Sequence, residues 1–214
     1  MIKACIFDLD GVIVDTAKYH YMAWKKLADQ LNIPFNEKDN ERLKGVSRMK
    51  SLEIILDLGN LNLSLEEKEE LAQKKNNWYV EYISKMDKSE LLPGVEKFIK
   101  ILKSKGIKIA IASASKNTKL ILERLNFEDV FDAVIDGTMI SNAKPNPEIF
   151  LTASNYLSLK PEECVVFEDA VAGIQAAKRA GMKVIGVGEE EVLKGADKVI
   201  KNFENINLTL IESI

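Results

Sequence analysis

The chain has 214 residues, of which 46% are hydrophobic and 29% charged, the balance of an ordinary globular protein. Lys and Arg total 30 and Asp and Glu total 33, so the net charge is -3 and no basic excess points to nucleic acid. The apolar runs are too short to span a membrane, and the first residues lack the pattern of a secretory leader. Cys5 and Cys164 lie in apolar runs that suit buried, reduced thiols. We expect a cytoplasmic monomer that binds neither nucleic acid nor membranes.

The predicted elements begin with a buried strand at residues 3–7, which ends at a carboxylate and a glycine typical of a loop. The segment that follows is helical in pattern as far as residue 86, with almost no strand signal. It predicts an amphipathic helix over 16–31 and a second helix over 47–58. A third, longer helix begins at a capping box that opens at Ser64.

After Pro93-Gly94 the pattern changes to an alternation of helices and strands, which predicts a parallel sheet with helices on both faces. The expected strands cover 107–112, 133–135, 163–167 and 183–186, and the expected helices cover 95–105, 118–125, 147–157, 170–180 and 207–212. The predicted fold class is therefore α/β. A Rossmann-like parallel-sheet core comprises residues 1–15 and 88–214, and an inserted all-helical domain comprises residues 16–87.

Ligands of an open parallel sheet bind at the carboxyl ends of the strands, and polar side chains gather at those ends here. Each one alone has an ordinary explanation. Asp10 suits a turn, and Lys144 suits an exposed loop. Ser113 and Asp169 suit helix N-caps. Together they converge on one edge of the sheet, which favours a binding site made of Asp8, Asp10, Ser113, Lys144, Glu168 and Asp169.

Four carboxylates at one edge repel one another unless a hard cation lies among them, and such an oxygen-rich set suits Mg²⁺. Magnesium and Lys144 can neutralise a phosphate that Ser113 binds. Asp8 can attack phosphorus in line and form an aspartyl phosphate. Residues two apart in an extended segment face the same side, so Asp10 can serve the same substrate as general acid and base. The sequence therefore predicts a Mg²⁺-dependent phosphoryl-transfer enzyme with Asp8 as its nucleophile.

These residues resemble the signature of the haloacid-dehalogenase superfamily, which has one motif after each of four strands. Here the motifs are Asp8-Leu9-Asp10-Gly11, Ser113, Lys144 and Glu168-Asp169. The helical insertion is similar to the cap domain of the phosphoglucomutase-like subgroup, and the segments 44–48 and 113–117 strengthen that likeness. The resemblance extends over nearly the whole chain. It implies an intramolecular phosphotransferase of the isomerase class that converts β-D-glucose 1-phosphate to glucose 6-phosphate through a bound bisphosphate.

The resemblance also implies roles for individual residues. It implies that Mg²⁺ is held by Asp8, Glu168, Asp169 and the main-chain carbonyl of Asp10. It places the transferring phosphate against Ser113, the backbone N–H of Ala114, and Lys144. A bisphosphate needs a second anion site, which the resemblance assigns to Arg48, Ser115 and Asn117. The sugar site would be completed by Lys44, Gly45, Lys75 and Asn76, although a lysine on a helix surface, as Lys75 is expected to be, is usually solvated.

His20 is the only histidine, and it lies one helical turn from both Thr16 and Trp24, so the three share a face. Position alone favours a neutral histidine packed against Trp24. The resemblance implies instead that Thr16 and His20 belong to the hinge of the cap and position Asp10. Both interpretations stay open.

Two other functions fit part of this pattern. A sugar-phosphate phosphatase of the same superfamily shares the aspartyl phosphate but transfers the phosphoryl group to water, and a second phosphate site would separate the two. A signalling receiver domain also stores phosphate on an aspartate. Such domains place the acidic pair on the first strand and lack a large insertion, so the insertion directly after Asp10 argues against this class.

Overall fold

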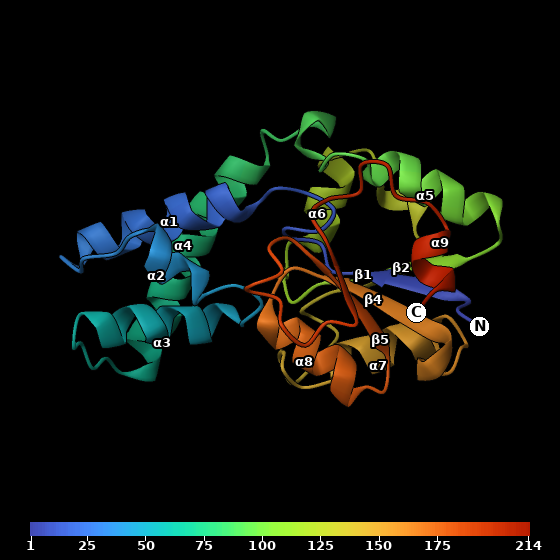
Figure 1. Cartoon of the computed structure of the whole chain (residues 1–214). Helices are drawn as coiled ribbons and strands as arrows, with labels where there is room; N and C mark the ends of the chain where they lie inside the picture. The colour runs from blue at the N-terminus through green and yellow to red at the C-terminus, as the bar shows by residue number, and fades with distance from the viewer.

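A computed structural model describes residues 1–214, and its centre is a six-stranded, fully parallel sheet (Figure 1). The strand order is β3-β2-β1-β4-β5-β6. Phe7 pairs with Ile111 of β2 on one side and with Phe167 of β4 on the other, so β1 is central. The predicted α/β fold class is confirmed. The strands are β1 Ala4–Phe7, β2 Lys108–Ala112, β3 Ala133–Ile135, β4 Cys164–Glu168, β5 Lys183–Val187 and β6 Lys198–Ile200.

Helices cover both faces of this sheet because alternate strand residues are apolar on both sides. In β1, Cys5 and Phe7 face a cluster that includes α5 (Val95–Ser104), α6 (Thr118–Arg124) and α9 (Thr209–Glu212). Ala4 and Ile6 face the opposite cluster, under α7 (Glu148–Tyr156) and α8 (Val171–Arg179). The Phe7 and Phe167 rings stack at 4.8 Å between centroids. Short 3-10 turns, Lys88–Glu90, Glu128–Val130 and Pro161–Glu163, complete the core.

Residues 16–87, called the cap below, contain four helices beyond the carboxyl ends of the strands (Figure 1). They are α1 Ala17–Gln30, α2 Glu37–Glu41, α3 Arg48–Leu58 and α4 Leu65–Ile83. The cap has its own apolar cluster, which includes Trp24, Leu27 and Ile55. The expected helix starts are found: Ser47 accepts from the backbone of Lys50, and Ser64 forms a capping box.

The two segments that join the cap to the core run side by side. Asp15 N donates to Glu90 O at 3.2 Å, and Leu92 N donates to Ile13 O at 3.0 Å. The Glu90 carboxylate also accepts from the side chains of Lys18 and Tyr19. We propose that the hinge of the cap lies here, at the domain boundaries expected from the sequence.

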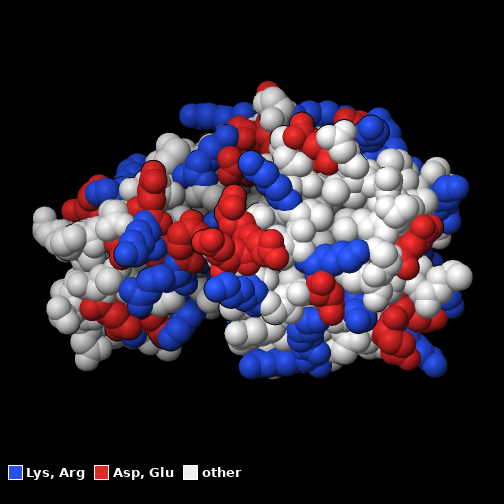
Figure 2. All heavy atoms as spheres, in the orientation of Figure 1, with Lys and Arg blue, Asp and Glu red and all other residues white.

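Two elements, α2 and β6, were not predicted from the sequence. Helix α2 has only five residues, and its Asn36–Asp39 capping box was not recognised as a helix start. Strand β6 has three half-buried residues at the edge of the sheet, so it lacks the apolar run of a central strand. Cys5 and Cys164 are buried and free, as expected. No helix has the length and apolar character needed to cross a membrane, and Figure 2 shows acidic and basic side chains mixed over the visible face.

Candidate active site

Three carboxylates meet where β1 and β4 end. Asp8 follows β1, Glu168 is the last residue of β4, and Asp169 comes next. One oxygen from each lies within 4.8 Å of the others. Burial, opposed in part by the Lys144 charge, raises the pKa of Glu168 to about 7. Burial and the Glu168 charge raise the pKa of Asp169 well above its usual range.

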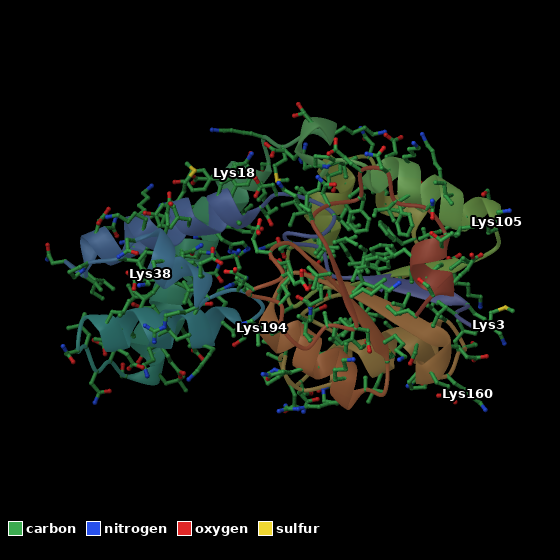
Figure 3. The ribbon with its side chains drawn as sticks, in the orientation of Figure 1. Lys3, Lys18, Lys38, Lys105, Lys160 and Lys194 are labelled. Atoms are coloured by element: carbon green, nitrogen blue, oxygen red, sulfur yellow. The ribbon has the colours of Figure 1, made fainter.

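Lys144 is buried under this group and does not lie in solvent. Its Nζ donates to Asp8 Oδ1, to Glu168 Oε2 at 2.8 Å and to Ala112 O at 3.3 Å. Burial alone would lower the pKa of Lys144, but the two carboxylates outweigh it and raise that pKa. Figure 3 shows the contrast with labelled lysines such as Lys38 and Lys160, which extend from the surface.

The donor set fits a divalent cation. If all three carboxylates are ionised, the one ammonium leaves two negative charges uncompensated in a mostly buried space, and a bound cation would stabilise that ionised form. All the free donors are carboxylate oxygens, which hard divalent cations prefer. Asp8, Glu168 and Asp169 are therefore the side chains that would hold the ion.

Asp10 faces the same edge but has different partners. Thr16 Oγ1 donates to Asp10 Oδ1, and Ser113 Oγ donates to Asp10 Oδ2 at 3.4 Å. Burial and the nearby Asp8 charge raise the pKa of Asp10 to about 6. Near neutral pH a fraction of Asp10 therefore carries a proton, which suits a group that both gives and takes protons.

The loop after β2 presents polar groups toward the cap. Ser113 Oγ accepts from Ser115 N at 3.1 Å, and Ser115 Oγ accepts from Asn117 N at 3.2 Å. Asn117 Nδ2 donates to Asn76 Oδ1 of α4 at 3.0 Å, which joins core and cap. Ser113 does not cap α6. Asp169 likewise does not cap α8, whose N-cap is Ala170, so neither ordinary explanation holds.

On the cap side, the ordinary explanation of Lys75 as a solvated surface lysine does not hold, because only 2% of it is exposed. Lys75 Nζ contacts His20 Nδ1 at 2.9 Å and lies 4.6 Å from the ring centroids of Trp24 and Tyr79. Burial and the Arg48 charge lower the pKa of Lys75 well below its usual range. His20 stacks on Tyr79, not on Trp24, and its Nε2 lies 4.0 Å from Asp10 Oδ1.

The segment before α3 approaches the core closely. A Cβ on Gly45, whose φ is +71°, would lie 3.0 Å from the Ala170 Cβ. Lys44 Nζ is paired with Glu41 at 2.8 Å. Burial lowers the pKa of the Arg48 guanidinium.

One cavity of about 540 Å³ lies between cap and core and brings most of the expected residues together. Three of the expected residues are buried and do not line it: Thr16, Lys144 and Glu168. Ser51 and Gln73 also line the cavity but were not predicted from the sequence, although Ser51 lies one helical turn after Arg48. The expected residues that line the cavity are Asp8, Asp10, His20, Lys44, Gly45, Arg48, Lys75, Asn76, Ser113, Ala114, Ser115, Asn117 and Asp169.

This arrangement agrees with comparisons to known proteins. A family model described as haloacid dehalogenase-like hydrolase matches residues 2–181. The chain belongs to this family, and the predicted resemblance is confirmed.

Individual relatives cover nearly the whole chain. The beta-phosphoglucomutase of Bacillus subtilis (strain 168) is 47% identical over 211 residues, 98% of this chain and 93% of the relative. A phosphorylated carbohydrates phosphatase of Thermotoga maritima is 32% identical over 216 residues, 96% of this chain and 97% of the relative. The crystal structure of beta-phosphoglucomutase from Clostridium difficile superposes with a TM-score of 0.95 at 46% identity, covering 100% of this chain and 96% of that one.

Gly173 in α8 makes room for a carboxylate of the site. A Cβ at this position would lie 2.1 Å from Glu168 Oε2, so Gly173→Ala must displace that carboxylate. We expect the variant to bind Mg²⁺ about 10- to 100-fold more weakly, as measured by calorimetric titration. Gln175→Ala, at an exposed position of the same helix, is the control and should bind normally. Equal Mg²⁺ affinity in both variants would contradict the assignment of Glu168 as a ligand.

Proposed function

We propose that the protein interconverts β-D-glucose 1-phosphate and glucose 6-phosphate, as an intramolecular phosphotransferase that carries the phosphoryl group on Asp8. The observation that carries this proposal is the single cavity that connects Asp8 and Asp10 with Arg48 on the cap. Such a cavity can hold both ends of a sugar bisphosphate. The name of the 47% identical relative supports the same activity.

The proposed binding roles follow the positions around the cavity. Bound Mg²⁺, held by Asp8, Glu168, Asp169 and the main-chain carbonyl of Asp10, would neutralise charge on the transferring phosphoryl group. Ser113, Ala114 and Lys144 would hold that group, and Arg48, Ser115 and Asn117 would hold the second phosphate. The sugar would lie against Lys44, Gly45, Lys75 and Asn76.

The chemistry uses two carboxylates in turn. Asp10 takes the proton of the sugar 6-hydroxyl as its oxygen forms a bond to phosphorus, and the bond from phosphorus to Asp8 breaks, which leaves Asp8 as a free carboxylate. The bisphosphate then turns over in the cavity. Asp8 attacks the phosphorus at the 1-position, the bond to the sugar oxygen breaks, and Asp10 returns a proton to that oxygen. Glucose 6-phosphate leaves, and Asp8 is phosphorylated again.

Thr16 and Ser113 support the role of Asp10 in this cycle. Both hydroxyls donate to the Asp10 carboxylate, one to each oxygen. They fix its direction without taking a proton from it. We propose that Thr16, at the hinge, links the position of the cap to this orientation, with His20 on the neighbouring turn of α1.

The function is tested by supplying β-D-glucose 1-phosphate, Mg²⁺ and a priming glucose bisphosphate, and by measuring glucose 6-phosphate and free phosphate together. We expect glucose 6-phosphate as the main product. Free phosphate alone would identify a sugar-phosphate phosphatase, the function named for the 32% identical relative. A single turnover per chain with no sugar product would instead point to a receiver-type domain.

A further inference from the structure

Glu90 lies in the second segment that joins the cap to the core, and its carboxylate reaches across to α1. Its Oε1 accepts from the Tyr19 hydroxyl at 2.6 Å, and its Oε2 accepts from Lys18 Nζ at 2.5 Å. Only 16% of the Glu90 side chain is exposed, against 47% of the Lys18 side chain. Burial alone would raise the pKa of Glu90, but the bonds from Lys18 and Tyr19 outweigh it and lower that pKa. The Tyr19 hydroxyl therefore donates to an ionised and partly buried carboxylate, which makes a stronger bond than a neutral acceptor does.

The backbone of Glu90 is bonded to the first joining segment. Its carbonyl accepts from Asp15 N at 3.2 Å. The preceding residue of that segment, Val14, accepts from Gly11 N at 2.8 Å, in the loop that carries Asp10. The side chain of Glu90 therefore extends from a pair of segments that is itself bonded to the loop of Asp10.

The first turn of α1 holds the other end of this arrangement. Thr16 is the N-cap of α1, and its carbonyl accepts from Tyr19 N at 3.0 Å, so the two residues belong to one hydrogen-bonded turn. Tyr19 binds that turn to Glu90, and the Thr16 hydroxyl binds it to the Asp10 carboxylate. The direction in which Tyr19 is held therefore also determines where the Thr16 hydroxyl points.

We propose that Glu90 is a positioning residue, whose bond to Tyr19 sets the angle of the cap. At this angle the Thr16 hydroxyl stays on Asp10. This proposal rests on the acid-base role of Asp10 in the proposed function. Without the Glu90 carboxylate, α1 can tilt about the backbone between Asp15 and Thr16, and the cap moves relative to the core. The Asp10 carboxylate then loses its fixed direction, so proton transfer to and from the sugar slows.

The position of the cap is measured first, without any reaction. Lys38 of the cap and Lys160 of the core are both exposed and lie in opposite parts of the molecule (Figure 3). They are changed together to cysteine and spin-labelled, because the two native cysteines are buried and should stay unlabelled. We expect the distances between the two labels to spread more widely after Glu90→Ala or Tyr19→Phe than in the doubly labelled parent.

Phosphorylation of Asp8 is then measured in single turnovers with two donors. A glucose bisphosphate releases a sugar alkoxide that needs a proton from Asp10, whereas acetyl phosphate releases a stable acetate that does not. We expect Glu90→Ala to lower the rate with the sugar donor about tenfold and to leave the rate with acetyl phosphate unchanged. A general loss of structure would lower both rates, so the ratio of the two rates reports positioning.

Further variants assign the effect to one bond. Tyr19→Phe loses only the hydroxyl, so it should behave as Glu90→Ala does, and the double variant should be no slower than Glu90→Ala alone. Glu90→Gln keeps an oxygen that can accept from Tyr19 and loses only the pair with half-exposed Lys18, so it should keep most of the rate. The matched control is Glu96→Ala, which removes a glutamate paired with exposed Lys100 on the core and should change neither rates nor distances.

Unchanged label distances in Glu90→Ala would overturn the proposal. So would an unchanged rate with the sugar donor, an equal loss with both donors, or a loss in Glu90→Gln as large as that in Glu90→Ala. Neither measurement depends on whether water or a sugar finally receives the phosphoryl group. Failure of the mutase proposal, seen as free phosphate alone from the unmodified protein, is therefore distinguishable from failure of this one.

Discussion

Asp8→Asn is expected to abolish turnover, by at least about 10⁴-fold. The neutral amide has nearly the same shape as the carboxylate but cannot attack phosphorus, so no phosphoenzyme forms. The change also removes one of the two carboxylates that surround Lys144 Nζ, and one of the three oxygen donors that would hold the cation. The loss of turnover is measured with β-D-glucose 1-phosphate. The loss of the phosphoenzyme is measured by mass spectrometry of the chain after exposure to acetyl phosphate.

The control is a second buried aspartate at the carboxyl end of a neighbouring strand. Asp136 follows β3, and its Oδ1 accepts from the backbone and hydroxyl of Thr138, bonds that an asparagine oxygen can also accept. Asp136→Asn should therefore retain turnover and accept phosphate. A phosphorylated Asp8→Asn chain, or sustained turnover by it, would show that another residue is the nucleophile.

Arg48→Ala is expected to have the second-largest effect. The guanidinium lines the cavity from the cap and can hold the distal phosphate with two hydrogen bonds. Without it the bisphosphate loses its anchor during each half of the cycle, and mutase turnover should fall about 10²- to 10³-fold. Asp8 lies on the core and should still accept phosphate from acetyl phosphate, which has no second phosphate to hold.

The matched control is Arg42→Ala, an exposed arginine in the same cap segment that does not line the cavity. It removes the same charge from the cap and should leave mutase turnover near that of the unmodified protein. If Arg48→Ala and Arg42→Ala turned over equally fast, the model with two phosphate sites would be wrong.

The sequence predicted well which side chains gather at the carboxyl edge of the sheet, because the topology alone brings the strand ends together. Asp8, Ser113 and Glu168 are far apart along the chain, but parallel pairing of β1 with β2 and β4 places them side by side. The α/β fold class could be predicted because strands and helices alternate along the chain after Pro93-Gly94. The assignment of individual roles to these residues stays a prediction that the variants above test.

The cap interior was harder to predict because it depends on how helices pack. Lys75 reads as a surface residue in α4, and only the packing of α4 against α1 buries it between Trp24 and Tyr79. The Tyr79 hydroxyl is buried without a hydrogen-bond partner, and this also depends on helix packing that the sequence does not show. Spacing shows which residues share a helix face, but it does not show which neighbouring helix covers that face.

The central position of β1 has a consequence for the order of folding. Ala4 is paired with Lys108 and with Cys164, so β1 cannot pair until strands much later in the chain have been synthesised. The cap has its own apolar cluster, formed by residues close together in the chain, and can collapse earlier. During synthesis the unpaired β1 is an exposed apolar segment, and aggregation of incomplete chains is expected to begin there.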